Sequence, residues 1–152
     1  LQRQGVISTW HDRMILPGSD WNQEIHQYLN TADIILLLVS PDFLNSDYSW
    51  GVEVKTAMQR HEAREVRVIP VILRVCNWKK APFAKLQALP KNAKPITKWA
   101  DRDEAFNNVV EGIEVAIQQL QENVQSSQST AKKLQLTAEQ SSGFYKSKVS
   151  VK

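Results

Sequence analysis

The fold is decided by the stretch Ile34-Ile35-Leu36-Leu37-Leu38-Val39, six consecutive apolar residues without alternation. A strand with one wet face alternates apolar and polar residues, whereas an unbroken apolar run is typical of a strand covered on both faces of a parallel sheet. The run ends abruptly at the polar sequence Ser40-Pro41-Asp42. We therefore expect a central strand here, flanked by helices on both sides.

A strand, a loop and a helix are predicted upstream of this run. Val6 to Trp10 has the β-branched and aromatic content of a strand, and Pro17-Gly18 is a strong turn signal. Asp20, with Gln23 three residues later, resembles a helix capping box. Four apolar residues then follow at the spacing of one helix face: Trp21, Ile25, Tyr28 and Leu29. The connecting segment, Asp12 to Asp20, is thus expected to be an exposed loop.

Downstream, the same alternation continues. We expect a helix capped by Ser46 or Asp47 and ending near His61, then a strand over Val66 to Leu73 in which Pro70 favours a sheet edge or a bulge. Ile96 to Trp99 is interpreted as a short final strand. Asp101 and Glu104 predict the start of a last helix, whose apolar stripe consists of Phe106, Val109, Val110, Ile113, Ile117 and Leu120.

The 152 residues suffice for one domain. We divide the chain into a folded part, residues 1–120, and a Gln/Ser/Lys-rich linker or tail, residues 121–152, whose few apolar residues predict disorder. The folded part is expected to be an α/β protein with a parallel sheet flanked by helices. Ligands of such sheets bind beyond the carboxyl ends of the strands, which directs attention to the loops after Trp10, Val39 and Leu73.

Composition argues against several function classes. Residues 1–120 carry equal numbers of basic and acidic side chains, so the net charge of +3 comes from the last part of the chain and gives no footprint for nucleic acid. No apolar run approaches the ~20 residues of a membrane span. Cys76 is the single cysteine, which fits a reducing, cytoplasmic compartment. His11, His26 and His61 lack metal-ligand spacing, and no metal is expected.

Several blocks of the chain, in order, resemble a bacterial-type Toll/interleukin-1 receptor (TIR) domain over roughly residues 1–120. The blocks are Trp10-His11-Asp12-Arg13 with Pro17-Gly18 and Trp21, the segment from Ala32 to Leu44, Ser46-Asp47-Tyr48 with Glu53, and Arg67-Val68-Ile69-Pro70-Val71. The resemblance implies a flavodoxin-like fold with a five-stranded parallel sheet. It also implies that Asp12 to Asp20 is the loop that the family uses for domain contacts and for shaping the ligand cleft, with Ile15, Pro17, Gly18 and Trp21 as interaction residues.

The family's first strand and first helix have no counterpart ahead of Leu1. In the strand order 2-1-3-4-5 the absent strand would be central, so two inner edges would be left unpaired. We expect residues 1–120 alone to be marginally stable or prone to aggregation. The chain is also expected to belong to a longer prokaryotic protein with further domains.

Enzymatic members of the family cleave the nicotinamide–ribose bond of NAD+, so the resemblance implies an NAD+ hydrolase in a signalling or innate-immunity role such as prokaryotic defence, with NAD+ as substrate and no cofactor. Glu53 occupies the position of the family's catalytic glutamate. Trp50 lies three residues before it where the family spacing is four, and Ser49 takes that place. Trp10, Asp12, Arg13 and Trp50 are the implied substrate-binding residues.

Other interpretations remain open for each of these residues. Glu53 could be a solvated helix residue paired with Lys55 or Arg60, and Asp12 and Arg13 an ordinary exposed ion pair. Trp10 and Trp21 could pack at the base of the loop instead of lining a cleft. For the whole domain, the main rival to catalysis is a non-enzymatic adaptor that associates with other TIR domains. A phosphoacceptor receiver is weaker, since Asp42 has no adjacent acidic pair.

Overall fold

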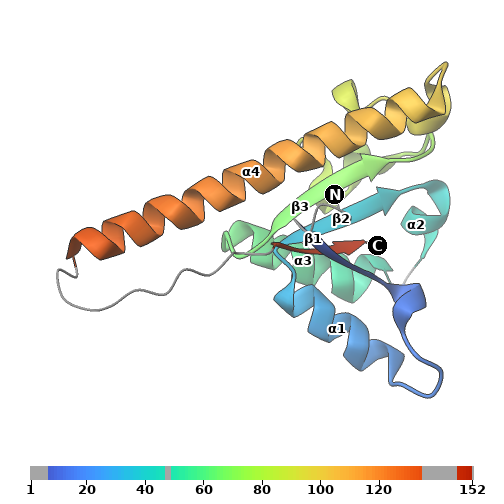
Figure 1. Cartoon of the computed structure of the whole chain (residues 1–152). Helices are drawn as coiled ribbons and strands as arrows, with labels where there is room; N and C mark the ends of the chain where they lie inside the picture. The colour runs from blue at the N-terminus through green and yellow to red at the C-terminus, as the bar shows by residue number, and fades with distance from the viewer. Residues whose placement is uncertain (1–6, 47–48, 135–146, 152) are drawn as a thin grey trace.

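The computed structural model describes residues 7–46, 49–134 and 147–151, which form a parallel sheet with helices on both faces (Figure 1). The described sheet has the strand order β1-β4-β2-β3. Its strands are β1 (Ile7–His11), β4 (Ser147–Val151), β2 (Ile34–Val39) and β3 (Arg67–Ile72), and all their pairings are parallel. The predicted α/β class with a flavodoxin-like parallel sheet is confirmed.

The unbroken apolar run of β2 is explained by burial on both faces. Ile35, Leu37 and Val39 point to one cluster, which α1 (Trp21–Thr31) and α3 (Val54–Glu62) cover with the buried side chains Ile25, Leu29, Val54, Ala57 and Met58. Ile34 and Leu36 point to the other cluster, beneath α4 (Arg102–Leu134). Figure 1 shows α4 crossing one face of the sheet, with α1 and α3 on the other.

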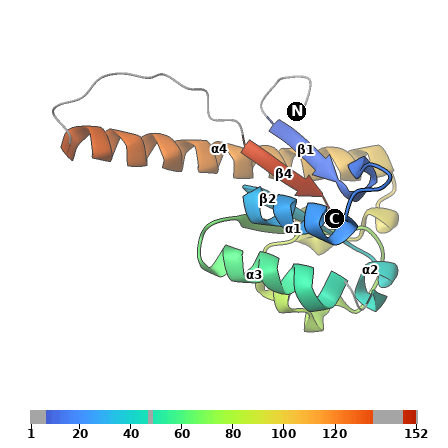
Figure 2. The ribbon, with the colours of Figure 1, turned by 90° about the horizontal axis from the view of Figure 1, so that it is seen from below.

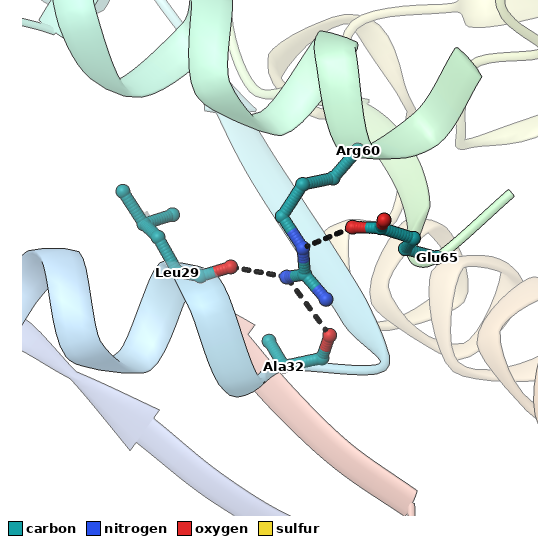
Figure 3. Close-up of polar contacts among 4 residues, drawn as sticks. All are labelled: Leu29, Ala32, Arg60 and Glu65. Atoms are coloured by element: carbon teal, nitrogen blue, oxygen red, sulfur yellow. Dashed lines mark hydrogen bonds and ion pairs between the residues drawn. The ribbon is translucent and has the colours of Figure 1, made fainter. Parts of the chain in front are cut away.

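The two helices on the first face are joined by polar contacts as well as by apolar packing. Arg60 of α3 donates from Nη1 to the carbonyl oxygens of Leu29 and Ala32, at the end of α1, with 3.2 Å to Ala32 (Figure 3). Its Nε lies 3.4 Å from the carboxylate of Glu65. A cation at the C-terminal end of a helix also interacts favourably with the helix dipole.

β3 lies at the edge of the described sheet, as Pro70 predicted. On the side of β3 that faces away from β2, Leu89 pairs with the strand. The Leu89 N–H donates to Pro70 O at 2.8 Å, and the Leu89 carbonyl accepts from Ile72 N at 2.8 Å. The expected strand over Ile96 to Trp99 is wrong, because this segment is the 3-10 helix η6 (Ile96–Lys98), following η5 (Lys91–Ala93). The single-residue bridge at Leu89 already occupies the place that such a strand would need.

Two local expectations need correction. Ser46 does not begin a helix: it ends α2 (Pro41–Asn45), a short helix capped by Ser40, whose Oγ accepts from Phe43 N at 3.1 Å. On α4, Phe106 and Val110 are exposed, and the buried stripe is made by Ala105, Val109, Ile113, Ala116 and Ile117. Small alanines let the helix lie close to the sheet, so the inner face is rotated from the one that large apolar residues suggested.

The segment after residue 120 differs from the expected unstructured tail wherever the structure describes it. α4 continues to Leu134, and within this part the Ser126 Oγ donates to Glu122 O at 2.9 Å. Figure 1 shows this second half of α4 reaching past the sheet. Ser147–Val151 then forms β4, beside β1 in Figure 2. The expectation of two unpaired inner edges is therefore wrong for the described chain, since β4 pairs with both β1 and β2.

Candidate functional site

Three connecting segments come together at the edge of the sheet formed by the carboxyl ends of the parallel strands. β1 continues into the 3-10 helix η1 (Asp12–Met14), β2 into α2, and β3 into Leu73 and Arg74. The last two connections are linked there by Arg74 Nη1 and Asp42 Oδ2, 3.2 Å apart. Both side chains are exposed, so this pair contributes little to stability. It marks the edge where open α/β sheets bind ligands.

Glu53 lies at this edge, at the point where a π-helical turn, η2 (Ser49–Glu53), continues into α3. The turn contacts α2, which follows the end of β2. Only 2% of Glu53 is exposed, and its carboxylate does not cap α3. π-Helical turns are rare and frequent at functional sites. A carboxylate at the start of a helix is stabilised by the helix dipole.

The interpretation of Glu53 as a solvated surface residue is wrong, because its side chain is buried. Arg60, one of its suggested partners, interacts with Glu65 instead, and Lys55 is exposed. Burying a carboxylate is costly in any fold, so sequences keep one in such a place when it has a purpose there.

The loop between β1 and α1 presents apolar side chains to solvent. Leu16 is 72% exposed, Met14 52% and Trp21 43%, while Ile15 packs against the core cluster beside α1. Ser19 N donates to Leu16 O at 3.1 Å, closing a turn with Pro17 and Gly18 at its centre. Gly18 has a φ of +89°, which the third residue of a type II turn requires.

The helix after this loop begins as predicted. Asp20 accepts a hydrogen bond from Gln23 N at 3.1 Å and caps α1. Trp21 is the first residue of α1 and Arg13 is exposed in η1. Trp10, Asp12 and Trp50 have their backbones in β1, η1 and η2, but their side chains lie outside the described part. The structure thus brings the backbone segments of the predicted site to one edge and leaves the roles of these side chains as predictions.

A hollow that the sequence did not predict lies at the amino-terminal ends of the strands, opposite the edge where Glu53 lies. It measures about 940 Å³ and is bounded by the starts of β2 and β3, the end of α3 and the overhanging half of α4. Lys85 donates to Glu62 there at 2.7 Å, and this hydrogen bond, with the charge of Lys85, lowers the pKa of Glu62. The hollow depends on the part of α4 that projects past the sheet, which no local sequence pattern predicted. Its lining includes Asp33, His61, Arg64, Arg67, Lys85 and Val124.

Cys76 is a packing residue. It is half-buried against the cluster beside α1 and α3, and this burial raises the pKa of its thiol. Within residues 7–46, 49–134 and 147–151, no group of three or more potential metal ligands comes together. None of the helices described is both long and apolar enough to cross a membrane.

The sequence profile of the TIR domain matches residues 1–110. "Uncharacterized protein y4lF" of Sinorhizobium fredii (strain NBRC 101917 / NGR234) is 54% identical over 116 residues, which is 76% of this chain and 36% of that protein. The chain thus spans about a third of the length of this relative. No solved structure matches.

Proposed function

Because the chain belongs to the Toll/interleukin-1 receptor (TIR) domain family of signalling modules, we propose that it hydrolyses the nicotinamide–ribose bond of NAD+ when copies of the full-length protein assemble. Glu53 is the catalytic carboxylate in this proposal. The observation that carries it is a glutamate 2% exposed, in a π-helical turn at the ligand-binding edge of a parallel sheet.

The chemistry suits a site with one carboxylate. Breaking the bond develops positive charge on the ribose carbon, and a carboxylate held in a dry site stabilises that charge or orients the ribose hydroxyls. Nicotinamide leaves as a neutral molecule from a cationic ring, so no general acid is needed. Water then adds to the ribose carbon, giving ADP-ribose and a proton that passes to solvent.

The burial of Glu53 supports the requirement for assembly. A ribose reaches this carboxylate only after neighbouring side chains move, and contact between copies at the same edge supplies that movement. We assign Arg13, Asp12, Trp10 and Trp50 to substrate binding around it, because their backbone segments lie at this edge. A cytoplasmic location, where NAD+ is abundant, and a role in prokaryotic defence belong to the same proposal.

A second candidate is a non-enzymatic adaptor that binds other TIR domains. The exposed loop favours it, because Leu16 at 72% and Met14 at 52% exposure are large apolar residues beside a tight turn. Apolar groups gathered on a surface loop mark a contact site more often than a catalytic one. Both candidates use the same loop for association and differ in what Glu53 does.

The test is nicotinamide release by the full-length protein incubated with NAD+, followed by chromatography. We expect Glu53→Gln, which keeps the side-chain shape, to lower turnover at least 100-fold, a typical loss for one electrostatic group in a dry site. Glu62→Gln, at the exposed end of the same helix α3, is the matched control and should keep full turnover. Equal turnover in Glu53→Gln and wild type removes Glu53 from the mechanism. No turnover by an assembled wild type leaves the adaptor.

A further inference from the structure

The hollow at the amino-terminal ends of β2 and β3 has the size of a small-molecule site. It measures about 940 Å³, and clefts that bind small molecules measure about 300–1,000 Å³. One wall is the half of α4 that reaches past the sheet, where Leu120 and Val124 are half-buried (Figure 1). The facing wall consists of the end of α3 and the starts of the two strands, with Val66 buried there. The hollow thus offers an apolar surface and room for an organic molecule.

The charged side chains around this hollow leave an excess of positive charge. Two carboxylates are compensated by ion pairs, Glu62 with Lys85 at 2.7 Å and Glu65 with Arg60 at 3.4 Å. Two further lining residues, both arginines, lie outside these pairs, and a third carboxylate stands near them. The four cations are Arg60, Arg64, Arg67 and Lys85, and the three carboxylates are Asp33, Glu62 and Glu65. This balance favours an anionic ligand.

Two of the donor side chains in the lining are held in place by hydrogen bonds within the protein. His61 Nδ1 accepts from Val68 N at 3.2 Å, so Nε2 carries the N–H of the neutral ring. Arg67 Nη1 donates to Gln119 Oε1 at 2.5 Å, which fixes the guanidinium between β3 and α4. A guanidinium has further N–H groups with which it binds an anion. Donors that are positioned in advance lose less entropy when a ligand binds.

Arg64 occupies a backbone position that usually belongs to glycine. It follows the end of α3 with a φ of +61°, and its N–H donates to His61 O at 3.0 Å. Helices commonly end on a glycine in this left-handed conformation, because a Cβ makes the conformation costly. Non-glycine residues in this conformation are concentrated at functional sites. An arginine that lines a hollow from such a position therefore indicates a role for its side chain.

From these observations we infer that the hollow binds a phosphate monoester with an apolar body. Arg64 and Arg67 hold the phosphate, since guanidinium groups bind oxyanions through paired hydrogen bonds. His61 Nε2 donates to the same group, so three donor groups match its three terminal oxygens. The apolar body lies against Leu120 and Val124 of α4. This site is at the opposite end of the strands from Glu53, and it does not rest on the proposed reaction with NAD+.

Isothermal titration calorimetry of the full-length protein with 1-naphthyl phosphate tests the ligand class. We expect one molecule bound per chain, at least about tenfold more tightly than inorganic phosphate or 1-naphthol, because each of these has one of the two recognised parts. Failure of 1-naphthyl phosphate to bind, or equal affinity for the three compounds, overturns the proposal.

Variants test whether the binding takes place in the hollow. Arg64→Gly suits the left-handed backbone and should keep the melting temperature, but weaken binding at least about tenfold, as loss of a charged donor does. Arg67→Gln should weaken binding more than Arg67→Lys, which keeps the charge. Arg102→Gln, at the other end of α4, and Glu53→Gln are controls that should leave the affinity unchanged. Wild-type affinity in Arg64→Gly, or an equal loss in either control, overturns the proposal.

Discussion

Arg60 joins α3 to the end of α1 through polar contacts. Its guanidinium bonds to the carbonyl oxygens of Leu29 and Ala32 on α1, and its side chain is 16% exposed (Figure 3). Hydrogen bonds to a charged donor in a partly buried place are the stronger kind. Its ion pair with Glu65 is weaker, since the Glu65 side chain is 60% exposed.

Replacing Arg60 with methionine should destabilise the domain by about 2–3 kcal/mol, because two carbonyl oxygens at the end of α1 lose their charged donor. Glu65→Gln, which removes the exposed partner alone, should cost less than about 1 kcal/mol. Urea denaturation followed by circular dichroism measures both. Equal losses in the two variants would show that the contacts with α1 contribute nothing beyond the ion pair.

The sequence patterns predicted local hydrogen bonds and turns correctly where residues close in the chain determine them. The cap of α1 by Asp20 and the turn at Gly18 follow from bonds within four residues, and both are present as predicted. The burial of Glu53 could not be foreseen in the same way. Whether a helix residue faces water depends on what packs against it, and α2 and the π-helical turn are set by the fold.

At the scale of elements, α4 covers one face of the sheet with a stripe of small and branched residues. Ile113 is buried in the cluster with Ile34 and Val149, whereas Val115, two positions on, is exposed. Gly112 lies against Leu89, since a Cβ there would come within 2.6 Å of the Leu89 side chain. The helix therefore packs closely against its neighbours at Gly112, and its large apolar residues Phe106 and Val110 are exposed.

Ile113→Ala should lower the free energy of unfolding by about 2–5 kcal/mol, the usual cost of a large-to-small change in a packed core. Val115→Ala should leave it unchanged within about 0.5 kcal/mol, since an exposed helix position prefers alanine slightly. Thermal and urea unfolding compare the two variants with wild type. Similar losses for both would mean that α4 does not pack on the sheet through Ile113.

At the scale of the whole molecule, the exposed apolar loop and the buried Glu53 lie on connections that leave the same sheet edge. Such an edge serves both association and catalysis if contact between copies moves the groups that cover the carboxylate. The charge balance of residues 1–120 is neutral, so apolar contact, not charge, is the expected force of association.

Leu16→Asp should weaken self-association of the full-length protein at least tenfold, because a charge would have to be buried at the contact. Val115→Asp changes an exposed apolar residue on α4 and should leave association unchanged. Analytical ultracentrifugation over a concentration series gives both dissociation constants. If the two variants behave alike, the loop is not the contact surface, whatever the outcome of the NAD+ assay.

The sequence by itself determined the α/β class, the buried strand β2, the edge position of β3 and the capped loop before α1, because apolar period, proline and capping residues act over a few neighbours. The division at residue 120 stays a prediction. Tertiary structure alone decided that α4 continues to Leu134, that Glu53 is buried and that residues 147–151 complete the sheet. Strand pairing joins segments far apart in the chain, so the short sequence of β4 does not by itself show that it pairs with β1 and β2.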